Sequence, residues 1–198
     1  MITGAKGWSN RELVHSQENN PTEAFQKATL TERAEWLESC GPTSAVNCLE
    51  AMGFKVAVVC PGKFEPQPEE VLMDYFNDPR NRDKLKAIRN VADIPGNRVP
   101  QYYPEAVLDV FGVRAEFRWL PSYDAVCKLV SGGQAVQVCL EKPGHYIALV
   151  AYDSDTRELI YHDSWGSRFK DGAGGYARRM GVVEFTSNVK NYCIVYGV

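Results

Sequence analysis

The sequence lacks what a membrane-spanning, secreted or nucleic-acid-binding chain would show. Its longest uninterrupted apolar run extends only from Tyr146 to Tyr152, far short of the roughly 20 residues that cross a bilayer. The first residues, Met1 to Arg11, have no apolar core of a secretory signal. We therefore expect a cytoplasmic protein, or one exported without a cleavable signal sequence. With 22 Lys and Arg against 25 Asp and Glu, the formal net charge is −3, which excludes the broadly basic surface that non-specific nucleic-acid binding requires.

The sequence also lacks internal repeats, low-complexity tracts and metal-binding motifs. Its six cysteines are scattered, with neither a CxxC pair nor a Cys/His cluster at zinc-finger spacing. This pattern predicts no metal and no cofactor, and cysteines that are mostly reduced and buried as small apolar side chains. What is present, 44% hydrophobic and 24% charged residues over 198 positions, is typical of one soluble globular domain, or of one domain in two lobes.

The chain changes character near residue 132. Residues 1–20 are polar, and their sequence predicts an N-terminal arm or a short irregular segment. The pattern of residues 21–132 predicts a mainly helical lobe, and that of residues 133–198 predicts an antiparallel β lobe. Together they predict a single α+β domain over residues 1–198, with a helical lobe packed on a sheet. The expected helices lie near 21–28, 31–37, 42–52, 69–76, 82–88, 103–111 and 124–130, and the expected strands at 113–119, 135–140, 146–152, 159–162, 182–185 and 193–196.

Cys40 stands immediately before the strongest helical pattern. Pro42 is tolerated in a first helical turn, and Gly53 is well placed to end the helix. Backbone N–H groups and the positive end of the helix dipole would then surround the sulfur and favour the thiolate, which is the form that attacks carbonyl groups. The alternative is an inert cysteine buried at a helix start.

His145 opens the most apolar strand, and Asp163 ends the next one, 18 residues later. If these strands form a hairpin around residues 153–158, antiparallel register returns Asp163 to the level of His145. Taken singly, His145 is typical of a hydrogen-bonded core or surface residue, and Asp163 of a strand-end turn. A nucleophilic thiol, however, needs a base, and the base needs an orienting group, so the three residues together favour catalysis.

Three short segments carry a family resemblance: residues 40–45 (CGPTSA), 144–146 (GHY) and 163–166 (DSWG). They resemble the papain-like cysteine peptidase superfamily and, within it, the C39-like peptidase group, over roughly residues 35 to 170. The resemblance implies a papain-like fold with Cys40 as nucleophile, His145 as general base and acid, and Asp163 fixing the imidazole tautomer. It also implies that Trp165 shields the histidine–acid contact from water.

The same resemblance implies acyl transfer through an acyl-enzyme, with a peptide, a protein or a peptidoglycan stem peptide as substrate. Peptidases of this kind usually carry a glutamine about six residues before the cysteine, which helps to bind the oxyanion. Residues 33–39 (RAEWLES) contain neither Gln nor Asn. The Trp36 indole or the Ser39 hydroxyl would then have to supply a second donor beside the Cys40 N–H. Two alternatives stay open: a binding module without turnover, and an acyl transferase with the same triad.

The remaining candidate residues are expected to have structural roles. Strand alternation points His162 to the face opposite Asp163, and His15 lies in the polar arm, where we expect it to be solvated. Cys48 is expected in the core. The glycine-rich loop from Gly166 to Tyr176, with several Arg and Lys residues nearby, either lines the cleft or is an ordinary surface loop.

Overall fold

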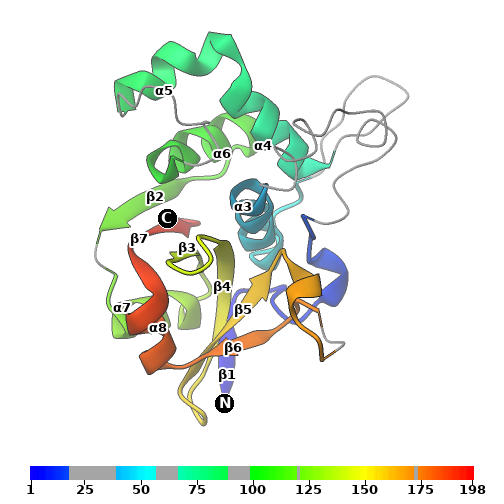
Figure 1. Cartoon of the computed structure of the whole chain (residues 1–198), viewed down its shortest axis with the longest axis vertical. Coiled ribbons are helices and arrows are strands. Elements are labelled where there is room, and N and C mark those ends of the chain that lie inside the picture. Colours follow the sequence, from blue (N-terminus) through cyan, green and yellow to red (C-terminus); the bar gives the residue numbers. More distant parts are fainter. Residues whose placement is uncertain (18–38, 57–66, 89–98, 120, 172–173) are drawn as a thin grey trace.

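The sheet of this protein is covered by helices on both faces (Figure 1). The computed structural model describes residues 1–17, 39–56, 67–88, 99–119, 121–171 and 174–198. The helices predicted near residues 21–28 and 31–37, and with them Trp36, lie outside this part of the chain. The α+β class predicted from the order of elements is confirmed.

All strand pairings in the described part of the chain are antiparallel. The strand order is β2-β7-β3-β4-β5-β6, and β1 pairs with β4 outside this path. The strands are β1 (Ile2–Gly4), β2 (Ala115–Trp119), β3 (Ala135–Leu140), β4 (Tyr146–Asp153), β5 (Glu158–Asp163), β6 (Arg178–Met180) and β7 (Val189–Tyr196).

Helices come from both halves of the chain. The α-helices are α3 (Cys40–Ala51), α4 (Pro68–Asn77), α5 (Arg82–Ile88), α6 (Tyr103–Phe111), α7 (Tyr123–Ser131) and α8 (Val182–Asn188). Short 3₁₀ helices are η1 (Arg11–Leu13), η2 (Pro79–Asn81), η4 (Pro100–Tyr102) and η5 (Gly166–Arg168). Helix α6 ends where predicted, because Gly112 adopts a left-handed conformation with φ 69°.

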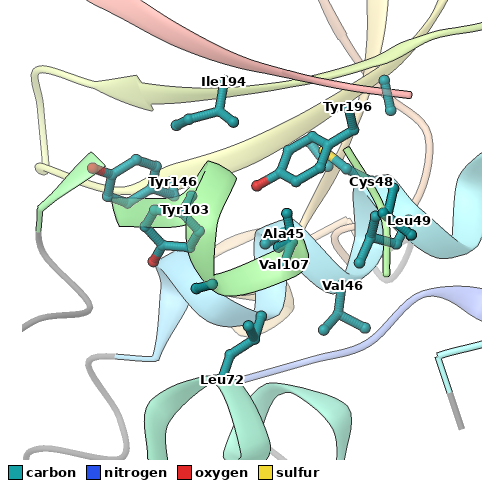
Figure 2. Close-up of a cluster of buried hydrophobic side chains, with 14 of the residues drawn as sticks. Ala45, Val46, Cys48, Leu49, Leu72, Tyr103, Val107, Tyr146, Ile194 and Tyr196 are labelled. Atoms are coloured by element: carbon teal, nitrogen blue, oxygen red, sulfur yellow. The ribbon is translucent and has the colours of Figure 1, made fainter. Parts of the chain in front are cut away.

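Two hydrophobic clusters lie on the two faces of the sheet. One cluster joins α3, α4 and α6 to the sheet (Figure 2), and the other joins α7 and α8 to the opposite face. Every residue of β3 is buried, because its alternating side chains enter one cluster or the other. Helix α3 is also buried along most of its length, so its position relative to the sheet is set by packing.

The structure corrects two predictions for the fold. Residues 182–185 were expected to form a strand, but they belong to α8. Val182 and Val183 are exposed, and only Phe185 of this helix is buried, against Tyr123 of α7. A short apolar run does not distinguish a strand from a helix that buries one side chain. The N-terminal segment is not simply irregular, since Ile2–Gly4 form β1 and extend the sheet.

No helix in the described ranges combines the length and apolar character needed to cross a membrane.

Candidate active site

Cys40 is the first residue of α3. Thr43 ties this first turn down, because its backbone N–H and its hydroxyl both donate to the Ser39 carbonyl, at 3.0 and 2.9 Å. Among the described cysteines Cys40 alone is partly exposed, whereas the other four, Cys48 included, are buried. Cys40 is therefore the described cysteine that is not enclosed in the core.

A buried amide connects the sheet to the start of α3. The Gln137 side chain, from the centre of β3, donates from Nε2 to the Gly41 carbonyl at 2.8 Å. Its Oε1 accepts a hydrogen bond from the Tyr196 hydroxyl at 2.5 Å. Gln137, Gly41 and Tyr196 are all buried, so each polar group needs this partner. The network fixes the first turn of α3, and with it Cys40, relative to the sheet.

His145 continues the β3–β4 ladder by one residue, because the Leu140 N–H donates to its carbonyl at 2.7 Å. Its Nε2 lies 2.7 Å from Asp163 Oδ1, and both side chains are buried. The Cys40 side chain lies near enough to the ring to raise the pKa of the His145 imidazole. The structure thus brings Cys40, His145 and Asp163 together.

The charge state of His145 follows from these contacts. Burial lowers the pKa of the imidazole, but the hydrogen bonds to Asp163 and Cys40 and the charges of both partners outweigh burial and raise this pKa to about 9. At neutral pH the ring is therefore an imidazolium.

Two further groups from the segment after β5 contact the pair. The Trp165 N–H donates to Asp163 Oδ1 at 2.8 Å, and the Trp165 indole packs edge-on against the His145 ring, with centroids 5.9 Å apart. Arg168 Nη2 lies 2.5 Å from Asp163 Oδ2. The carboxylate is therefore held on both oxygens, and one side of the imidazole is covered by an aromatic ring.

The sequence analysis missed Gln17. Its backbone N–H donates to the Ser164 carbonyl at 3.0 Å, and its side-chain Oε1 accepts from the Ser164 hydroxyl at 2.8 Å. Gln17 is thus fixed beside the residue that follows Asp163, although it lies far before Cys40 in the chain. A glutamine is expected directly before Cys40, and Gln17 lies in a distant polar segment whose sequence has no periodic pattern that would place it near the site.

The other candidate residues divide into two groups. His162 is structural, as predicted: it is buried, donates from Nε2 to the Trp8 carbonyl at 3.0 Å, and accepts at Nδ1 from the Ala177 N–H at 3.2 Å. The expectation of a solvated His15 is wrong. His15 Nδ1 lies 3.1 Å from the buried carboxylate of Glu69 in α4, and the His15 backbone N–H donates to Asn47 Oδ1 of α3 at 2.6 Å. Ser39 is fully buried.

The fold is the α+β arrangement that the order of elements in the sequence predicted. The sequence profile of the Peptidase_C39 like family matches residues 15–186, and the chain belongs to this family. Among curated proteins, none matches the sequence.

Two solved structures are similar to this chain. One is a crystal structure of a double glycine motif protease from an AMS/PCAT transporter in complex with the leader peptide, with a TM-score of 0.48 and 13% identity, over 79% of this chain and 82% of that chain. The other is the N-terminal peptidase C39 like domain of a toxin secretion ATP-binding protein from Vibrio parahaemolyticus. It has a TM-score of 0.35 and 13% identity, over 65% of this chain and 90% of that chain.

Proposed function

We propose that the protein hydrolyses peptide or amide bonds through a thiolate at Cys40. The observation that carries this proposal is the position of His145, whose Nε2 lies 2.7 Å from Asp163 Oδ1 and whose pKa is raised by the nearby Cys40 side chain. This is the order nucleophile, base and orienting acid that covalent catalysis by a thiol needs. Membership of a peptidase family supports the same reaction class.

In this mechanism the Cys40 thiolate attacks the carbonyl carbon of the scissile bond. The C–N bond breaks as the His145 imidazolium transfers its proton to the leaving amine, which leaves a thioester on Cys40 and a neutral ring. His145 then takes a proton from water, whose oxygen attacks the thioester. The acid product leaves, and the thiolate–imidazolium pair is restored. Asp163 keeps Nε2 protonated throughout, so that Nδ1 exchanges the proton.

We assign the oxyanion donors to the Cys40 N–H and the Gln17 carboxamide. The Cys40 N–H belongs to the first helical turn, whose N–H groups have no partner within the helix. The Ser164 hydroxyl donates to Gln17 Oε1, so the amide NH₂ of Gln17 is directed away from Ser164. The absence of a glutamine directly before Cys40 was the reason to consider an inactive binding module; the position of Gln17 beside Ser164 supports an active site instead. Neither Trp36, which lies outside the described residues, nor Ser39 is then needed.

Selective alkylation tests the proposal. Iodoacetamide should label Cys40 at pH 6 to 7 and faster than the other cysteines, whereas an ordinary thiol reacts mainly near its pKa of about 8.5. The wild type should also cleave members of a panel of peptides and peptidoglycan stem peptides, and Cys40→Ala should not. Cys127→Ala is the matched control, because burial raises the pKa of the Cys127 thiol to about 11.

Three results would decide against hydrolysis at Cys40. Labelling of Cys40 only at alkaline pH, together with identical cleavage by wild type and Cys40→Ala, would overturn the mechanism. Labelling at pH 6 to 7 without cleavage of any panel member would favour a binding module. Transfer of the acyl group to an added amine in preference to water would make the protein an acyl transferase with the same triad.

A further inference from the structure

The two carboxylate oxygens of Asp163 have different partners. Oδ1 accepts from Trp165 and pairs with His145. Oδ2 is buried, and within the described residues it makes no hydrogen bond of good geometry. Its one cationic neighbour there is the Arg168 guanidinium, with Nη2 at 2.5 Å. Since a buried carboxylate is costly without a counter-charge, the environment of Oδ2 depends on Arg168.

Arg168 is held in this position by the loop that follows β5. Its side chain is about four-fifths buried, with 21% exposed, and its guanidinium lies 4.7 Å from the centroid of the Phe169 ring. Arg178 lies over the same ring at 3.9 Å, but it pairs with Asp171 at 2.6 Å. Two arginines therefore share one aromatic ring, and one of them is directed at the carboxylate of the site.

The proposed reaction makes this arrangement consequential. In the resting state the His145 imidazolium is a counter-charge for Asp163. Once the ring has given its proton to the leaving amine, His145 is neutral, and the buried carboxylate loses that cation until deacylation. Arg168 cannot lose its proton under these conditions, so it is the charge that persists through the cycle.

We infer that Arg168 is a positioning residue of the active site, a fourth member beside the triad, which orients the Asp163 carboxylate and neutralises it while His145 is uncharged. This inference rests on the proposed function. Among the described residues, Cys40 from α3, Arg168 from η5 and Tyr161 from β5 are titratable or charged groups close to the Asp163–His145 pair. Arg11 and His15 line a cavity of about 440 Å³ together with Asp163. Glu69 of α4 pairs with His15.

The pH profile of Cys40 alkylation tests the inference with Arg168→Gln, Arg168→Lys and Arg178→Gln. The profile has two limbs, one for ionisation of the Cys40 thiol and one for ionisation of the His145 imidazolium. Removal of a positive charge raises the proton affinity of every nearby group, so both limbs of the Arg168→Gln profile should move to higher pH by about half a unit or more. Arg168→Lys keeps the charge but loses the planar fork. Its limbs should stay in place, while kcat for peptide cleavage falls at unchanged KM. Arg178→Gln should match the wild type.

Coincident limbs in Arg168→Gln and wild type, or an equal displacement in Arg178→Gln, would overturn the role of Arg168. If Arg168→Gln does not fold by circular dichroism, Arg168→Lys still decides: displaced limbs, or an unchanged kcat, would contradict the inference. The proposed function fails separately, because it requires wild-type Cys40 to react at pH 6 to 7 whatever the Arg168 variants do.

Discussion

Asp163 faces Ile147 across the β4–β5 ladder, and this pairing depends on one extra residue in β4. The strands follow one register where Asp153 pairs with Glu158 and Ala151 with Ile160. They follow another where Leu149 pairs with Tyr161 and Ile147 with Asp163. Val150 is the residue left without a partner, which defines a β-bulge. In the first register Asp163 would face Ala148. Side chains alternate along a strand, so His145 and Ile147, two residues apart, lie on the same face of the sheet. Because the bulge pairs Asp163 with Ile147, the Asp163 carboxylate lies on that face too.

The N-terminal strand packs directly on this bulge, so Gly4→Ala should weaken it. The Ala5 N–H donates to the Val150 carbonyl at 2.9 Å. A Cβ added at Gly4 would lie 2.4 Å from Ala151 Cβ and 2.6 Å from the Val150 oxygen. Both neighbours belong to a central strand that cannot yield, and overpacking of this kind costs about 1–3 kcal/mol. We expect a lower Tm and slower labelling of Cys40.

The control for this variant is Gly181→Ala. Gly181 has φ −87°, and an added Cβ would meet nothing within 4 Å. Thermal unfolding of this variant should match the wild type. Equal Tm values for Gly4→Ala and wild type would show that β1 does not support the bulge.

Asp163→Asn should remove a pH dependence of stability above neutrality. The folded-state pKa of His145, about 9, exceeds the ordinary histidine value of 6.5. The stability gained from this proton is therefore fully present below pH 6.5 and is lost as the pH rises from 6.5 to 9, by up to a few kcal/mol. An amide at position 163 removes most of the gain. Urea unfolding between pH 6 and pH 9.5 measures the slope.

Asp124→Asn is the matched control, because Asp124 is an exposed aspartate in the first turn of α7. It should keep the wild-type slope, whereas Asp163→Asn should have a flatter one, even though its overall stability is lower with Arg168 left unpaired. A parallel slope in Asp163→Asn would mean that the carboxylate does not hold the proton on His145.

Local sequence signals predicted the elements that carry the site, but not the contacts between distant segments. Gly112 marks the end of α6, and the cysteine at the start of α3 and the two strands of the His145–Asp163 hairpin were placed from short patterns. These features depend on residues close in sequence. The bulge at Val150 has no such signal, because a central strand buried on both faces reads as one apolar run.

Gln17 and Arg168 were beyond prediction for a related reason. Gln17 reaches the site because its segment packs against Ser164, far along the chain. Arg168 was recognised only as part of a basic loop, since its sequence position does not say which of the loop's cations faces Asp163. The prediction of a strand at residues 182–185 was wrong for a different reason: the local apolar pattern is compatible with both a strand and a helix.

Gln17→Ala should separate catalysis from nucleophile reactivity. Loss of one oxyanion donor costs roughly 10²- to 10³-fold in kcat. Alkylation by iodoacetamide forms no oxyanion, so the labelling rate of Cys40 should stay within about twofold of the wild type, since the charges around the thiolate are unchanged. Peptide cleavage and labelling are measured on the same preparations.

Gln134→Ala is the control and should change neither rate, because the Gln134 side chain donates to the Gly197 carbonyl at 3.5 Å and contacts no residue of the proposed site among those described. If Gln17→Ala slows labelling as much as cleavage, Gln17 supports the structure around Cys40 and does not bind the oxyanion.

His162→Gln should make the protein less sensitive to acid. Burial lowers the pKa of His162 to about 4, and the hydrogen bond to Trp8 offsets burial only in part. Protonation would also direct a second ring N–H at the Ala177 N–H, which now donates to Nδ1. The unfolded chain takes up this proton near pH 6.5, so the stabilising contribution of neutral His162 is present above pH 6.5. It is lost as the pH falls from 6.5 to 4, by up to a few kcal/mol.

A glutamine can keep the hydrogen bond to the Trp8 carbonyl without titrating, so the wild-type loss of stability between pH 6.5 and pH 4 should be largely absent from His162→Gln. His15→Gln provides the contrast. Burial lowers the pKa of His15, but Glu69 outweighs burial and raises it, so the proton on His15 stabilises the fold at low pH. Its removal should not relieve acid unfolding. Urea titrations at pH 4, 5, 6 and 7 compare the three proteins, and an unchanged acid slope in His162→Gln would show that other groups cause the loss.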